Sequence, residues 1–170
     1  GEYDAIDTAN VLRHLQTVHG FSSATTVLMG GSAGGLTALN TAVRDASLCA
    51  GVVVKYPVVD LVAMLHSDDP FEGHHMPALI GSENQAAAHS PHKNAAELRG
   101  VPVLVFHGDQ DHSVPLFHSE RLRDAVEAAG GNIQLEVFAG EGHGFRNPVN
   151  IGREFAVTEA FLHSLMKNAR

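Results

Sequence analysis

Hydrophobic positions in this chain fall into short, densely apolar runs separated by longer amphipathic stretches. Three runs show no alternation of apolar and polar side chains, which is typical of parallel strands buried on both faces of a sheet. They span residues 25–29, 50–56 and 101–106. A fourth run, residues 133–138, alternates apolar with polar side chains, which indicates a strand near a sheet edge with one wetter face.

Helical spacing of apolar residues fills the stretches between these runs. The expected helices span residues 4–19, 33–45, 116–129 and 148–167. Pro115 precedes the third helix and Gly130 follows it, while Asn147 or Asn150 caps the last. Because buried strands alternate with helices, we predict an α/β fold with a mostly parallel sheet and helices on both faces.

Large apolar side chains recur at an approximate helical spacing in the first and last predicted helices. In the first helix these are Ile6, Val11, Leu12, Leu15 and Val18. In the last helix they are Ile151, Phe155, Leu162 and Leu165.

Residues 60–99 interrupt the alternation with a polar, histidine-rich excursion. A stretch of this length inside a compact domain is usually functional, so we predict a lid or a pocket wall. His74 and His75 lie among acidic residues, but adjacent histidines rarely bind one ion from a single backbone segment, and no H-E-x-x-H sequence is present. We therefore expect no metal ion and no cofactor.

The composition fits a single domain over residues 1–170, with 44% hydrophobic residues. The net charge is −8, with only 11 basic side chains, so we expect no nucleic-acid partner. No apolar run approaches the roughly 20 residues that span a bilayer, so no membrane partner is expected either. Cys49 is the single cysteine, which excludes an intrachain disulfide, and its neighbours predict a buried thiol.

The chain begins with Gly1 and enters a helical pattern almost at once, so we interpret it as a domain truncated at its N-terminus. No signal peptide is visible, although a chain without its true start cannot show one. The expected location is cytoplasmic, and the oligomeric state is left open.

Candidate chemistry begins where the first predicted strand ends, in Gly30-Gly31-Ser32-Ala33-Gly34. This G-x-S-x-G sequence between a strand and a helix is typical of a nucleophile elbow. We expect Ser32 on a strained turn, with Gly30 and Gly34 removing side chains that would collide across it. The Ala33 amide at the helix N-terminus would face a developing oxyanion. A phosphate-binding turn is disfavoured because the Rossmann spacing and the P-loop lysine are absent.

An acid and then a histidine should follow such a serine along the chain. After the third predicted strand, Asp109 is the better turn stabiliser, which leaves Asp111 as the acid. After the fourth strand, His143 lies between two glycines, where a histidine has little packing reason to be. We predict that His143 takes the Ser32 proton while Asp111 orients the ring. His107 ends a strand and is expected to be a hydrogen-bonded core residue.

These motifs resemble the prolyl oligopeptidase family of serine peptidases, with acylaminoacyl-peptidase and dipeptidyl-peptidase-like catalytic domains as the nearest match. The similar segments are residues 30–35, 107–115 and 140–145, together with Ser90-Pro91-His92. The resemblance implies the C-terminal part of an α/β-hydrolase catalytic domain, preceded in full-length members by a β-propeller. It also implies hydrolysis of oligopeptides through an acyl-enzyme, without a metal or an organic cofactor.

In this resemblance, Ser32, Asp111 and His143 match the family's triad, and the Ala33 amide matches one oxyanion donor. Family members supply a second donor, usually a tyrosine hydroxyl, from well upstream of the serine. Neither Tyr3 nor Tyr56 matches that position. Because losing one donor typically costs about 10²–10³-fold in turnover, we expect this chain alone to be a poor enzyme.

Two other functions stay open, and both use the same fold. The first is a carboxylesterase or dienelactone-hydrolase-like enzyme, because triad chemistry does not choose between an amide and an ester. A dienelactone-hydrolase-like enzyme would normally place cysteine at position 32. The second is an inactive binding module, although such a module has no need for a strained serine turn. The expected partner is therefore a small peptide or ester substrate.

Overall fold

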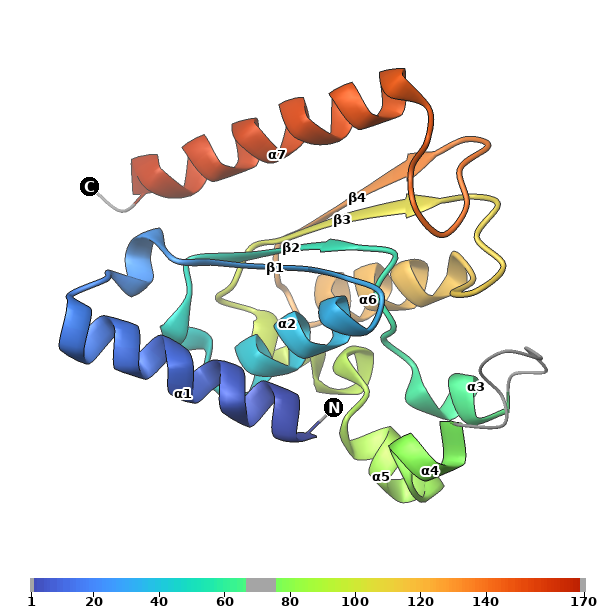
Figure 1. The fold of residues 1–170 in the computed structure, drawn as a ribbon, viewed down its shortest axis with the longest axis horizontal. Coiled ribbons are helices and arrows are strands. Elements are labelled where there is room, and N and C mark those ends of the chain that lie inside the picture. Colours follow the sequence, from blue (N-terminus) through green and yellow to red (C-terminus); the bar gives the residue numbers. More distant parts are fainter. Residues whose placement is uncertain (1, 67–75, 169–170) are drawn as a thin grey trace.

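A parallel sheet forms the centre of the computed structural model, which describes residues 2–66 and 76–168 (Figure 1). Its strands are β1 (Val27–Gly31), β2 (Gly51–Lys55), β3 (Val103–Gly108) and β4 (Ile133–Phe138). They pair in the order β1-β2-β3-β4, and each neighbouring pair is parallel. The α/β class and the parallel sheet predicted from the hydrophobic runs are confirmed.

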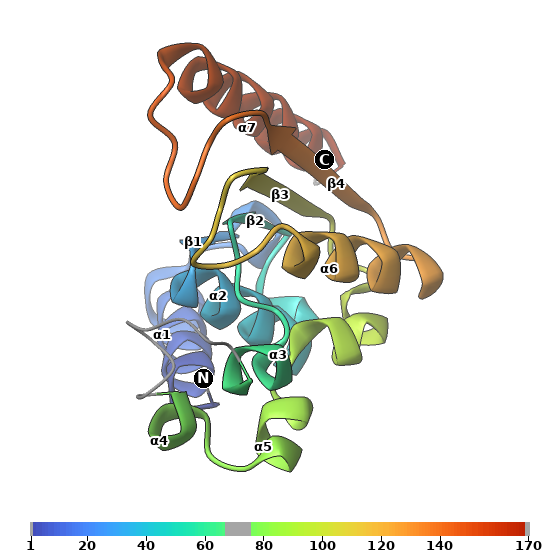
Figure 2. The ribbon, with the colours of Figure 1, turned by 90° about the vertical axis from the view of Figure 1, so that its right-hand side faces the viewer.

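Long helices cover both faces of this sheet (Figure 2). On one side lie α1 (Glu2–His19), α2 (Ala33–Arg44) and α6 (Phe117–Ala128), and on the other lies α7 (Pro148–Asn168). Asn147 Oδ1 accepts a hydrogen bond from the Val149 N–H over 2.9 Å, so Asn147 caps α7 as one of the two predicted residues. No helix within the described ranges is long and apolar enough to cross a membrane.

The predicted excursion after β2 is largely helical. It forms α3 (Leu61–Leu65), α4 (Met76–Ile80), α5 (Glu83–Ala88) and the 3₁₀ segment η3 (Pro91–Leu98). Two shorter 3₁₀ turns, η1 (Ser23–Thr25) and η2 (Ala46–Leu48), lie elsewhere in the chain. Ser82 and Gln85 form a reciprocal capping box that starts α5. His74 and His75 lie outside the described residues.

The hydrophobic core fills the space on both faces of the sheet. Between the sheet and helices α2 and α6, the fully buried side chains include Leu39, Val54, Val105 and Leu122. Between the sheet and α7, the buried cluster consists of Val53, Leu104, Phe106 and Phe138. Burying a side chain of this size contributes about 1.5–3 kcal/mol. Cys49 is buried as predicted. This packing fixes the strand ends that carry the candidate site.

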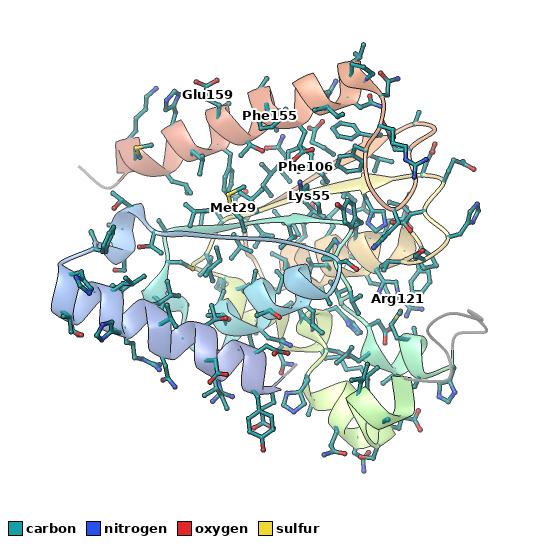
Figure 3. The ribbon with its side chains drawn as sticks, in the orientation of Figure 1. Met29, Lys55, Phe106, Arg121, Phe155 and Glu159 are labelled. Atoms are coloured by element: carbon teal, nitrogen blue, oxygen red, sulfur yellow. The ribbon has the colours of Figure 1, made fainter. Side chains whose placement is uncertain are left out.

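β1 is an exception to the prediction of strands buried on both faces. Its Met29 side chain is 58% exposed. β1 pairs with β2 on one side only, and within residues 2–66 and 76–168 no other strand pairs with it. Figure 3 labels Met29 on this strand, on the side of the sheet where α7 lies. The prediction for this strand is therefore wrong.

The apolar residues at helical spacing in α1 and α7 are not all buried. Val11 of α1 is exposed, whereas Ala5 and Ala9 are buried. α1 packs along α2, and small side chains let two helices approach closely. Phe155 of α7 is 69% exposed (Figure 3), while Phe161 packs on the sheet. Side-chain size alone did not identify the buried face of either helix.

Candidate active site

Ser32 lies at the sharp turn between β1 and α2. Its φ and ψ angles are 55° and −124°, a combination that is strained for a residue with a side chain. The Ser32 N–H donates a hydrogen bond to the Lys55 carbonyl over 3.0 Å, so the neighbouring strand holds the turn. The serine follows the strand and precedes the helix as the sequence predicts.

Two glycines make this turn possible, but only one of them was predicted correctly. A Cβ atom on Gly30 would lie 2.3 Å from the Gly34 carbonyl oxygen. A Cβ atom on Gly35 would lie 2.9 Å from Cβ of Pro57. At Gly34 no atom lies within 4 Å of such a Cβ, so the expectation that Gly34 avoids a collision is wrong. Gly35 makes the second close approach instead.

Three side chains from three strand ends form one hydrogen-bonded chain. His143 Nε2 lies 2.9 Å from Ser32 Oγ, and His143 Nδ1 lies 2.8 Å from Asp111 Oδ2. With the proton on Nδ1, the ring donates to the carboxylate, and Nε2 can accept the serine proton. The structure thus brings together the three residues singled out from the sequence, in the arrangement that a nucleophile, a base and an orienting acid require.

Asp111 is almost fully buried, and its surroundings favour the ionised form. Burial raises the pKa of this carboxyl group, but hydrogen bonds from His107, the Val114 amide and His143 outweigh it and lower the pKa below its usual value. Asp111 Oδ1 also accepts hydrogen bonds from the Ser113 and Val114 amides, over 3.0 and 2.9 Å. A charged carboxylate is what stabilises a protonated histidine in a triad.

His107 is a buried core residue, as predicted, and it also holds the loop that carries the acid. Its Nε2–H donates to the Val114 carbonyl over 2.8 Å, and its Nδ1 accepts from the Ser119 hydroxyl over 2.6 Å. Nε2 lies 3.5 Å from Asp111 Oδ2. The sequence indicated the burial of His107 but not its contact with the acid.

The loops that carry the acid and the histidine lie in direct contact. The Gln110 N–H donates to the Glu141 carbonyl over 2.9 Å, and a Cβ on Gly108 would lie 2.2 Å from that same oxygen. Asp109 Oδ1 accepts the Gly140 N–H over 2.7 Å. Asp109 therefore joins the neighbouring loop, whereas the sequence suggested that it stabilises its own turn.

Glu141 closes the histidine loop and was not identified from the sequence. Its carboxylate accepts hydrogen bonds from the Arg146 and Asn147 amides and from Asn150 Nδ2, each over 2.9 Å. The hydrogen bond from Asn150 and those from the two amides lower its pKa. The acidic residue two positions before His143 was the available signal in the sequence.

Tyr56 is a second residue that the sequence did not reveal. It has a positive φ of 38°, directly after β2. Its ring centroid lies 4.6 Å from that of His143 and 5.5 Å from that of Phe145. The tyrosine ring therefore packs against the imidazole and limits its movement.

A cavity of about 430 Å³ opens beside Ser32. Its apolar lining consists of Leu36, Val58, Leu61, Met64, Leu79 and Ile80. Asp4 and Thr37 also line the cavity, and Ser32 and Ala33 lie where the first turn of α2 leaves N–H groups without partners inside the helix. The excursion after β2 thus forms a pocket wall, one of the two roles predicted for it. In the described part of the chain, no group of three potential ligands could hold a metal ion.

A model of the prolyl oligopeptidase family matches residues 1–169. The chain belongs to the prolyl oligopeptidase family. The family predicted from the motifs is thereby confirmed, and this family member has the α/β-hydrolase fold of its structural relatives.

Solved structures similar to this family member include hydrolases of two kinds. A puromycin hydrolase is 28% identical, with a TM-score of 0.88 over 96% of this chain and 25% of that one. A puromycin-hydrolyzing peptidase of Mycobacterium tuberculosis is 27% identical, with a TM-score of 0.86 over 95% of this chain and 25% of that one. Esterase 2 of Thermogutta terrifontis shares the fold at 22% identity, with a TM-score of 0.73 over 95% of this chain and 64% of the esterase.

One curated relative matches a short stretch of this family member. It is an isoprenylcysteine alpha-carbonyl methylesterase of Arabidopsis thaliana, 36% identical over 42 residues, which are 25% of this chain and 10% of the relative. The chain thus spans about a tenth of that relative and a quarter of the puromycin hydrolases. Family and neighbours together support a serine hydrolase.

Proposed function

We propose that this protein is a serine hydrolase that cleaves peptide bonds of oligopeptides through an acyl-enzyme on Ser32. The hydrogen-bonded chain from Ser32 through His143 to Asp111 carries the proposal. The two hydrolases of puromycin, which are above 25% identical to this chain, favour an amide substrate.

In the proposed first half-reaction, Ser32 Oγ attacks the carbonyl carbon of the substrate while His143 Nε2 takes the serine proton. The Asp111 carboxylate stabilises the imidazolium that forms. The oxyanion of the tetrahedral intermediate accepts hydrogen bonds from the Ala33 amide and the N-terminus of α2. His143 then gives the proton to the leaving amine, and the C–N bond breaks.

In the second half-reaction, water replaces the amine. His143 takes a proton from the water as its oxygen attacks the acyl carbon, and it returns that proton to Ser32 Oγ as the ester bond breaks. The apolar cavity beside Ser32 supports an apolar side chain next to the scissile carbonyl, because Leu61 and Met64 offer it no hydrogen-bond partner.

Ester hydrolysis is the second candidate. The 42-residue match to a methylesterase favours it, because that relative acts on an ester. The same triad would release an alcohol instead of an amine, so the acyl-enzyme chemistry is unchanged.

The turnover of an aminoacyl anilide and of a short-chain nitrophenyl ester by the intact protein distinguishes a peptidase from an esterase. A peptidase is expected to turn over both substrates, and Ser32→Ala should remove both activities by about 10⁶-fold. Turnover of the ester alone would contradict the peptidase proposal and support the esterase. Activity that survives Ser32→Ala on either substrate would contradict the role of Ser32.

A further inference from the structure

The inner wall of the cavity beside Ser32 is one short segment, residues 58–65, which we call the wall segment. Val58, Leu61 and Met64 face the cavity, and each is buried. The Val58 N–H donates to the Ser32 carbonyl over 3.4 Å, so the wall segment touches the backbone of the candidate nucleophile. A shift of the wall segment would change the width of the cavity. It would also change the distance between the wall segment and Ser32.

One histidine side chain accepts two consecutive amides of the wall segment. The Val59 and Asp60 N–H groups both donate to His118 Nδ1, over 3.3 and 3.2 Å. His118 is 1% exposed and lies in α6. Because two donors point at this nitrogen, it carries no proton, and the ring is neutral.

Other side chains also form hydrogen bonds or ion pairs with the wall segment. The Leu61 N–H donates to Ser90 Oγ over 3.0 Å, and His92 Nδ1–H donates to the Val59 carbonyl over 2.7 Å. Asp60 Oδ1 accepts the Ala63 N–H, and Asp60 Oδ2 is paired with Arg121, which Figure 3 labels. The wall segment is thus fixed by side chains of η3 and α6.

We propose that His118 is a positioning residue for substrate selection: as a neutral acceptor it holds the wall segment against the cavity, and its protonation releases that wall. The proposal rests on the proposed hydrolase function, since it concerns the pocket of the same site. A protonated Nδ1–H would face two N–H donors, so both hydrogen bonds would be lost and replaced by repulsion.

The surroundings of His118 shift its protonation to lower pH. Burial is the main cause, and it lowers the pKa of His118 to about 4. The Asp60 carboxylate opposes this shift, whereas His107 of β3, Arg121 of α6 and His92 of η3 favour it. The wall is therefore held at neutral pH and released as the pH falls toward 4.

Comparing hexanoyl and acetyl nitrophenyl esters on the intact protein tests the proposal. The ratio of their kcat/KM values reports on the pocket, because any change in the triad affects both substrates alike and cancels. In the wild type we expect the preference for hexanoyl to begin to fall as the pH approaches 4, and to fall by about tenfold or more once most of His118 is protonated below that pH, since a lost methylene contact is worth about tenfold or more.

Two variants separate positioning from a merely structural role. His118→Asn places Oδ1 where Nδ1 lies and cannot be protonated in this range, so it should keep the preference for hexanoyl at low pH. His118→Leu lacks the acceptor and should show the weakened preference at every pH. His163→Asn, on the exposed side of α7, is the matched control and should behave like the wild type.

A ratio that stays constant with pH in the wild type, or falls equally in His118→Asn, would overturn the proposal. Amide exchange of residues 59 and 60 is measured on the same samples and does not depend on activity. Their protection should fall with pH in the wild type but not in His118→Asn, and equal protection in both proteins would also overturn it. Labelling of Ser32 by a fluorophosphonate separately reports whether the hydrolase function itself fails.

Discussion

Two regions flank the same serine, and groups of different chemistry hold them in place. On one side, Asp109 of the acid loop accepts the Gly140 N–H of the histidine loop, and the Glu141 carboxylate accepts the Arg146 and Asn147 amides within the histidine loop. On the other side, the wall segment is held by the neutral imidazole of His118. These carboxylates accept their N–H groups while charged, whereas His118 accepts the two amides of the wall segment only while uncharged.

This difference gives the two sides different responses to acid. The pKa values of Asp111 and Glu141 are lowered by folding, so their contribution to stability is present above the unfolded values of 3.8 and 4.5 and is lost only below them. The pKa of His118 falls from 6.5 to about 4 on folding. Its contribution is therefore complete above 6.5 and is lost progressively as the pH falls from 6.5 toward 4.

The largest effect is expected from Gly108→Ala, which would break the contact between the two catalytic loops. The added Cβ would lie 2.2 Å from the Glu141 carbonyl oxygen and must push the loops apart. Because misplacing catalytic groups by about 1 Å can cost about 10²-fold, we expect at least that loss in kcat. Gly152→Ala in α7 meets no atom within 4 Å and is the control. Unchanged kcat in Gly108→Ala would show that the loops tolerate separation.

His118→Asn should remove a pH dependence that belongs to the wall side. We expect the wild-type free energy of unfolding to fall by up to about 3 kcal/mol, in the region between pH 6.5 and 4, through His118 alone. The Asn variant should lack this component, because its side chain does not titrate there. Urea melts followed by circular dichroism at several pH values measure it. If the free energy of unfolding fell equally with pH in the two proteins, the pH dependence would not come from His118.

Glu141→Gln should affect the catalytic side and leave the wall side alone. The amide group cannot accept from all three donors that the carboxylate binds, so the His143 loop loses part of its anchor. A fall in kcat of about tenfold is expected, because small displacements of catalytic groups are costly. The preference between long and short acyl esters should not change. A changed preference between long and short acyl esters with a normal kcat would mean that Glu141 acts on the wall side and not on the catalytic side.

Arg121→Gln is expected to have the smallest effect. Arg121 pairs with Asp60 and lies over the Phe117 ring at 4.6 Å, but its side chain is about half exposed. Half-exposed pairs of this kind contribute roughly 0–1 kcal/mol, so the melt should shift by no more than that. A loss of several kcal/mol would mean that Arg121, rather than His118, is the main anchor of the wall segment.

The sequence predicted the catalytic side better than the wall side, for a physical reason. Ser32, Asp111 and His143 lie in the segments that follow β1, β3 and β4, and parallel strands bring such ends to one edge. His118 bonds to Val59 and Asp60, which are distant in sequence, and its place in a helix gives no sign of these partners. Contacts between residues that are far apart in the sequence leave no periodic pattern in the sequence by which they could be predicted.

The same limit explains the errors at the surface and in the elbow. Val11 and Phe155 are apolar at helical spacing, yet the neighbouring elements contact other faces of their helices. Gly34 belongs to the G-x-S-x-G pattern, but Gly35 is the residue that lies against Pro57. A pattern indicates that a turn or a helix forms, while its close contacts depend on the register of the packed partner.

Labelling with a fluorophosphonate probe, followed by peptide mapping, tests most directly whether Ser32 is a nucleophile activated by His143. The intact protein should form one adduct, on Ser32, and His143→Ala should slow its formation by orders of magnitude in a sample that circular dichroism shows to be folded. An adduct on another residue, or equal labelling of Ser32 in His143→Ala, would contradict the triad.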